Sequence, residues 1–160
     1  MIQEEVYEVV KDIGARHGVK IKTQRGVYTV DAVSHEGLLS IQNTDGSLDD
    51  LAAHDGHYWL PVTDEYKPYL RPMSSITENE IQKIRDILNN GQVGRVIGQR
   101  DFEMCSGILW FTNMAEYDCV SVSMMNTVID CLDRYMLDHR GLIDRGLALE
   151  ALEGMYEATI

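Results

Sequence analysis

The spacing of hydrophobic and polar positions changes along the chain, and each change predicts a new element. Over residues 2–17 the apolar side chains recur every three or four positions, which predicts an amphipathic helix that ends at Gly18. From Val19 the pattern alternates, and glycines with turn-forming neighbours follow at positions 26, 37, 46 and 56. Short strands at that interval predict an antiparallel meander, closed into a small five-stranded barrel whose last strand is residues 57–62.

A segment with two prolines, residues 64–72, separates this pattern from a second one. Each proline favours an extended backbone at the residue before it, so we predict a linker. Residues 77–80 (Thr-Glu-Asn-Glu) then have the spacing of a helix capping box, with Ile76 and Ile81 placed as a hydrophobic staple. This arrangement predicts a helix that ends at residues 90–91 (Asn-Gly).

The C-terminal half continues this mixture of patterns. Residues 108–112 and 117–123 are rich in strand-forming side chains and predict a hairpin with its loop at 113–116. An apolar stripe over residues 128–136 predicts a further helix, capped by Asn126 or Thr127 and ended by a glycine at position 141.

These elements predict an α+β protein in two consecutive domains. Residues 1–72 form an N-terminal helix plus a small antiparallel β-barrel of SH3-like size, and residues 73–160 form a small helix-and-sheet C-terminal module. The composition agrees with a folded chain, since 44% of the 160 residues are apolar and 25% are charged.

The charge, −12 from 26 acidic and 14 basic residues, changes what partners we expect. It disfavours nucleic acid and anionic membrane surfaces and favours a basic protein partner. The acids are concentrated: residues 26–66 hold eight acidic side chains without a Lys or Arg, and residues 101–133 hold six. Asp49 and Asp50, in the first zone, are candidate binding residues. The alternative, which the sequence favours, is a solvated, solubilising surface.

Other features narrow the location and the chemistry. The N-terminus lacks the basic and apolar pattern of a secretory signal, and the longest apolar stretch is residues 107–111, so we expect a cytoplasmic protein. The three cysteines form no C-x-x-C pattern and are expected to be reduced thiols. We predict no metal and no cofactor.

Two loop motifs resemble metal sites but fit them poorly. Residues 43–50 alternate carboxylates around a glycine, yet an EF-hand register places Ile41 and Ala52 where oxygen donors are required, so a hairpin turn fits better. His54 and His57 flank an Asp-Gly turn, which favours exposed loop histidines over a zinc site.

The polar cluster Asp138, His139 and Arg140 allows two interpretations. Asp138 can orient His139 while Arg140 holds an anionic group by paired hydrogen bonds, with Arg71 as a further binding residue. Alternatively, His139 and Arg140 lie in the last turn of the preceding helix and neutralise its carbonyl end. No nucleotide-binding, nucleophile-elbow or zinc-protease motif occurs, so an enzyme is not indicated and not excluded.

Two blocks resemble a known group of proteins. Residues 67–75 (KPYLRPMSS), followed by the Thr-x-x-Glu helix start, and residues 138–156 (DHRGLIDRGLALEALEGMY) are similar to small uncharacterised proteins of phages and prophages of gut Bacteroidales. At residues 136–139 that group commonly reads His-Phe-Asp-Tyr, and a proline commonly stands where this chain has Leu152. The resemblance implies a phage-borne accessory protein inside a bacterial host cell and implies no catalytic residue.

Three functions therefore remain open from the sequence. The first is a non-catalytic binding module that engages a host or phage protein through an acidic surface and inhibits a host system. The second is a ligand-sequestering or hydrolytic protein with a pocket between the two modules, built from Arg71, His139 and Arg140. The third is a virion or assembly component.

Overall fold

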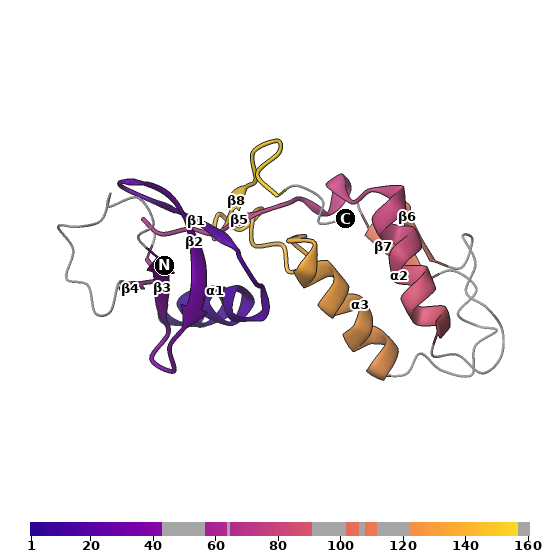
Figure 1. The fold of residues 1–160 in the computed structure, drawn as a ribbon, viewed down its shortest axis with the longest axis horizontal. Helices are drawn as coiled ribbons and strands as arrows, with labels where there is room; N and C mark the ends of the chain where they lie inside the picture. The colour runs from indigo at the N-terminus through magenta and orange to yellow at the C-terminus, as the bar shows by residue number, and fades with distance from the viewer. Residues whose placement is uncertain (43–56, 64, 91–101, 106–107, 112–121, 157–160) are drawn as a thin grey trace. The chain divides into compact units, whose positions relative to one another are not determined.

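A computed structural model describes residues 1–42, 57–63, 65–90, 102–105, 108–111 and 122–156. The chain divides into two compact units: unit 1 is residues 1–70 with 140–160, and unit 2 is residues 71–139 (Figure 1). Unit 2 is therefore inserted into unit 1. The sequence predicted two consecutive domains because the segment with two prolines marks where the chain leaves unit 1, while no pattern marks its return.

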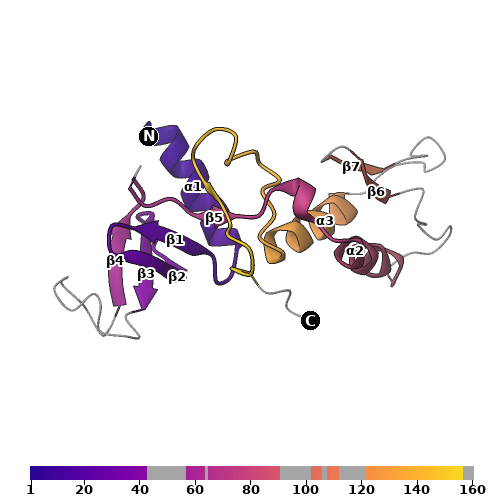
Figure 2. The same ribbon diagram turned by 90° about the horizontal axis from the view of Figure 1, so that it is seen from above.

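Unit 1 combines one helix with one antiparallel sheet, which confirms the α+β class. Helix α1 (Gln3–Ala15) follows the predicted apolar spacing. The sheet has the order β1-β2-β3-β4, with strands β1 (Lys20–Thr23), β2 (Gly26–Val33), β3 (Leu38–Gln42) and β4 (His57–Pro61). Figure 2 shows α1 beside this sheet. Both contribute fully buried apolar side chains, among them Val9, Ile13, Ile21, Leu39 and Ile41.

The sheet stays open, so the predicted five-stranded barrel is wrong. Its edge strands, β1 and β4, do not pair with each other. The segment that follows β4 occupies the outer edge of β1 instead: Ile21 forms a bridge with Pro68, and the Lys22 N–H donates to the Lys67 carbonyl at 2.9 Å. Closure would require β4 to pair at this same edge.

The segment predicted as a linker is part of the fold. Strand β5 (Tyr69–Leu70) pairs in parallel with β8 (Leu149–Glu150), which joins the two sequence segments of unit 1. The Tyr156 hydroxyl extends this connection, because it accepts the Lys20 N–H and donates to the Tyr69 carbonyl, both at 2.8 Å. Prolines restrict the residue before them to extended backbone, and that conformation suits a strand as well as a linker.

Unit 2 contains two helices and a hairpin. After a short 3-10 helix (Met73–Ser75) come α2 (Glu78–Asn90), β6 (Phe102–Cys105), β7 (Ile108–Phe111) and α3 (Val122–Arg134). The capping box is confirmed: the Glu80 N–H donates to the Thr77 hydroxyl, and the Glu80 carboxylate accepts the Thr77 N–H. Apolar side chains of α2 and α3 share one core that includes Ile76, Ile81, Ile84, Leu88, Val128, Cys131, Leu132 and Leu137.

Helix α3 differs from its prediction at both ends. It begins at Val122 rather than near Thr127, whose hydroxyl donates to the Ser123 carbonyl inside the helix. It ends at Arg134, because Met136 adopts a left-handed backbone (φ 58°) and the Leu137 N–H closes the turn onto the Leu132 carbonyl. Glycine usually occupies this position, so the sequence pointed to the later glycine instead.

The predicted hairpin is also displaced. The described antiparallel pair is β6 with β7, from Phe102 opposite Phe111 to Cys105 opposite Ile108. Residues 122–123, predicted as strand, belong to α3. The remainder of the predicted second strand and its loop, residues 112–121, lie outside the described residues.

Candidate functional site

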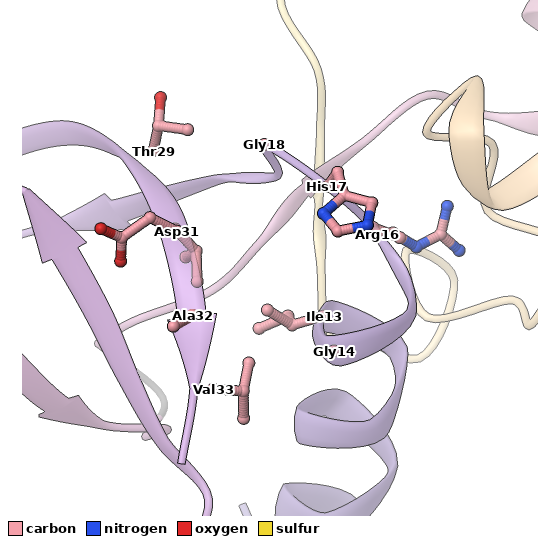
Figure 3. Close-up of a pocket in the computed structure, with 10 residues that line it drawn as sticks. Ile13, Gly14, Arg16, His17, Gly18, Thr29, Asp31, Ala32 and Val33 are labelled. Carbon is pink, nitrogen blue, oxygen red and sulfur yellow. The ribbon is translucent and has the colours of Figure 1, made fainter.

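A groove with a volume of about 530 Å³ opens in unit 1 between α1 and β2 (Figure 3). Ile13 and Gly14 form the helix wall, and Ala32 and Val33 form the strand wall. His17 stands at the end where α1 gives way to the loop before β1. The groove therefore combines apolar residues with polar ones, among them His17, Thr29 and Asp31.

Strand β2 pairs with β1 along its first half and with β3 along its second half. The second half therefore leaves one edge without a described strand partner beside the groove. Its first half pairs with β1, from Lys20 opposite Thr29 to Thr23 opposite Gly26. Its second half pairs with β3, with a bulge between Val30 and Ala32. Within the described residues no strand pairs with the other edge of residues 31–33, and these three residues line the groove. Such an edge offers backbone hydrogen-bonding groups to an added strand.

Gly14 has no side chain, so it leaves space on the helix side of the groove. A methyl group at this position would lie 4.0 Å from the Val33 Cγ2 atom, an ordinary van der Waals contact. Packing therefore tolerates alanine, which stabilises a helix by roughly 0.5–1 kcal/mol relative to glycine. A glycine where alanine also fits leaves the groove wider than the packing of α1 requires.

The charge of Arg16, which also borders the groove, is neutralised inside unit 1. Its guanidinium donates two hydrogen bonds to the Asp12 carboxylate, at 2.8 and 2.9 Å, and both side chains are fully buried. The Arg140 Nε lies 3.0 Å from the same carboxylate, in an ion pair whose angle is not that of a hydrogen bond. Figure 3 shows the Arg16 side chain directed away from β2. Asp31, which also lines the groove, is exposed.

Arg71, predicted as a binding residue, is a structural tie within unit 2. Its guanidinium binds both carboxylate oxygens of Glu80, at 2.6 and 3.1 Å, and the Ser75 carbonyl at 2.8 Å. Burial alone would raise the pKa of Glu80, but the hydrogen bonds from Arg71 and Thr77 outweigh it and lower that pKa. Arg71 thereby fixes the start of α2.

The cluster at residues 138–140 takes neither of its predicted arrangements. Because α3 ends at Arg134, these residues do not cap its last turn. The His139 Nε2 lies 2.8 Å from the Asp133 carboxylate in unit 2, and Arg140 pairs with Asp12 in unit 1. The Asp138 N–H donates to the Arg71 carbonyl at 2.8 Å. The structure therefore gives these side chains and backbone groups partners within their own units.

The acidic candidates fall mostly outside the part of the chain that the structure describes. Asp49 and Asp50 belong to residues 43–56, as do His54 and the loop that resembles a calcium site. Of the second acidic zone, Asp130 is exposed, whereas Asp133 is buried beside His139. The predicted binding role of the acidic zones stays a prediction.

Cys131, the described cysteine of α3, is not placed for nucleophilic chemistry. It is buried in the core of unit 2. Burial raises the pKa of its thiol, so the reactive thiolate is suppressed at neutral pH. Cys131 therefore contributes to packing.

Two features of unit 1 were not identified from the sequence, a cluster of basic residues near β1 and the groove beside β2. Only the basic cluster can be recognised in the sequence. Residues 13–30 contain no acid and four basic side chains, in a chain that is otherwise acidic. Three of the four, Lys20, Lys22 and Arg25, lie on β1 or in the turn that follows it. The groove left no such signal, because it depends on where β2 changes partners.

No family model, curated protein or solved structure matches this chain. Among the described residues, no helix is both long enough and apolar enough to span a membrane.

Proposed function

We propose that this chain is a non-catalytic binding protein, and that unit 1 takes an extended, basic segment of a partner protein into the groove between α1 and β2. The open edge of β2 at residues 31–33 carries the proposal. A segment added there forms backbone hydrogen bonds to β2 and continues the sheet. The resemblance to phage proteins supports a partner in the bacterial host or the phage.

The size and lining of the groove suit a single extended strand. Neighbouring strands lie roughly 4.8 Å apart, so an added strand runs along the edge of residues 31–33 that no described strand pairs with, beside the groove. One side of this strand faces Val33, which favours small apolar side chains there. Backbone pairing supplies affinity, and the apolar contacts select the side chains.

Charge selects a basic segment. Asp31 is exposed on the strand that would receive the segment, and a lysine or arginine opposite it forms a favourable cross-strand pair. Unit 1 as a whole contains 16 acidic and 8 basic residues, so its field attracts a cationic partner over distances of about one Debye length, roughly 8 Å at physiological salt.

A peptide titration of the whole ¹⁵N-labelled chain tests the proposal. The probe is an octapeptide of alternating lysine and valine, with two analogues: one has glutamate for lysine, and one is N-methylated at alternate amides. We expect saturable shifts of the backbone amides of residues 31–33 with the first peptide. Both analogues should bind at least tenfold more weakly, since one repels Asp31 and the other lacks strand donors.

Gly14→Ala separates binding from folding. The added methyl group narrows the groove, so peptide affinity should fall about fivefold while the melting temperature stays level or rises by a degree or two. Lys11→Ala, at an exposed position of the same helix, is the matched control and should leave affinity unchanged. Equal binding of the N-methylated peptide, or no shift at residues 31–33 with any peptide, would overturn the proposed function.

A further inference from the structure

A second concave site lies on the opposite, outer edge of β1. It has a volume of about 370 Å³ and is lined by Lys22, Thr23, Gln24, Glu65, Lys67 and Leu149. All six residues belong to unit 1, and none of them borders the groove beside β2. This site combines two cations, one carboxylate and one apolar side chain.

The two lysines face each other across a strand pair. Ile21 bridges Pro68 in antiparallel register, and the Lys22 N–H donates to the Lys67 carbonyl, which places Lys22 opposite Lys67. Residues opposite each other point to the same face of a sheet, roughly 5 Å apart at Cβ, and like charges there are destabilising. Lys20 points to that face as well, because it lies two positions from Lys22.

Little within the described residues compensates this positive charge. Lys22 forms no ion pair with a described acidic side chain, and the Glu65 carboxylate accepts instead from the Gln24 amide at 2.7 Å. The Lys67 Nζ donates to the Gly146 carbonyl at 2.6 Å, which uses one of its three hydrogens. The two lysines thus lie on opposite positions of the bridge, and both keep hydrogen-bond donors for a ligand.

We propose that this site binds a small phosphate ester with a hydroxylated organic part, such as a sugar phosphate. Lys22 and Lys67 hold the phosphate, whose charge of nearly −2 relieves their mutual repulsion. A phosphate group alone is much smaller than the site, which Glu65 and Leu149 also line. Glu65 accepts hydrogen bonds from hydroxyl groups, and Leu149 contacts the carbon skeleton.

A titration of the whole ¹⁵N-labelled chain, followed by its backbone amide shifts, tests the inference. The ligands are ribose 5-phosphate, inorganic phosphate and ribose, each added at constant ionic strength. We expect saturable shifts at residues 22–24, 65–67 and 149 with ribose 5-phosphate, at least tenfold weaker binding of inorganic phosphate, and none of ribose. Lys22→Gln should weaken ribose 5-phosphate binding at least tenfold. Lys11→Gln removes the same charge from an exposed position outside the site and should have no such effect.

Glu65→Gln tests the organic part of the ligand. Removing this negative charge should strengthen inorganic phosphate binding and reduce the preference for ribose 5-phosphate over it. Equal affinities for the two anions in the wild type, or equal losses in Lys22→Gln and Lys11→Gln, would indicate general attraction of anions and overturn the inference. Neither result bears on the groove beside β2, whose peptide titration is independent.

Discussion

The contacts that hold each unit together join residues at different separations along the sequence in unit 1 and in unit 2. In unit 1, the Tyr156 hydroxyl reaches Lys20 across 136 residues, and Arg145 reaches Glu8 across 137. In unit 2, Arg71 reaches Glu80 across nine residues and the Tyr135 carbonyl across 64. Unit 1 therefore depends on closing a longer loop than unit 2 does, and a longer loop costs more conformational entropy.

Each unit contains one of the two tryptophans, Trp59 in unit 1 and Trp110 in unit 2. Single-tryptophan variants, Trp110→Phe and Trp59→Phe, let fluorescence follow the unfolding of one unit at a time. If the two units are separate cooperative bodies, each substitution below should shift one transition and spare the other.

The largest effect is expected from Asp12→Asn in unit 1. The substitution keeps the shape of the side chain but leaves the buried Arg16 without its counter-charge, a defect that costs about 3–5 kcal/mol. Chemical denaturation followed at Trp59 should show this loss, and the Trp110 transition should not move.

Glu8→Ala is the matched control for Asp12→Asn. It also breaks an ion pair of α1, with Arg145, but both side chains are about half exposed. Exposed pairs contribute about 0–1 kcal/mol. Equal losses in the two variants would contradict the assigned role of the buried carboxylate, and a shift of both tryptophan transitions would contradict the independence of the units.

An intermediate effect is expected in unit 2 from Glu80→Gln, which weakens the bidentate pair with Arg71. At neutral pH the stability of unit 2 should fall by about 2 kcal/mol, as measured at Trp110. Asn79→Ala, an exposed neighbour on α2, should change it by less than about 0.5 kcal/mol.

The same pair gives unit 2 a defined response to acid. The pKa of Glu80 is lowered from its ordinary value of 4.5, so its contribution is complete above that value and is lost as pH falls through the folded pKa. The difference between wild type and Glu80→Gln should therefore shrink towards zero in strong acid. A difference that persists unchanged at pH 2 would show that the charge of Glu80 is not what stabilises α2.

The smallest effect is expected from Tyr156→Phe in unit 1, which removes two hydrogen bonds and about 1–2 kcal/mol. Burial raises the pKa of Tyr156 from 10.0 to about 12, so its contribution is complete below pH 10 and is lost as pH rises towards 12. Denaturation at pH 8 and 11, followed at Trp59, should show the wild type losing its advantage over the variant. An advantage that is constant over this range would exclude the hydroxyl as its source.

The helices were more predictable than the sheet because their signals are local. The spacing of apolar residues located α1, and the Thr77–Glu80 capping box located the start of α2. The open sheet, by contrast, depends on Pro68 reaching β1 and on Leu149 reaching β5, and neither contact has a signature in neighbouring residues. The end of α3 was missed because Met136 takes a backbone conformation that favours glycine.

The candidate sites were less predictable still. The sequence directed attention to polar residues such as Arg71 and His139, which the fold uses as internal ties. The groove beside β2 arises from a change of strand partner, which composition does not record. The lysine pair of β1 was partly visible as a stretch without acids, but its second member, Lys67, joins it only through tertiary pairing.

The insertion of unit 2 into unit 1 also determines the order in which the two units are completed during synthesis. Residues 1–70 leave the ribosome before residues 71–139, so β5 must wait for its partner β8 until unit 2 has been synthesised. Strand β8 begins 79 residues after the end of β5, so at about 5–20 residues per second the delay is roughly 4–16 seconds. Unit 2 is complete ten residues before β8 begins, which at the same rate leaves it roughly 0.5–2 seconds to fold first. During that interval the nascent N-terminal segment lacks Leu142, Leu147 and Ala148, which complete its core. The sequence of unit 2 is thus complete before that of unit 1, although unit 1 begins first.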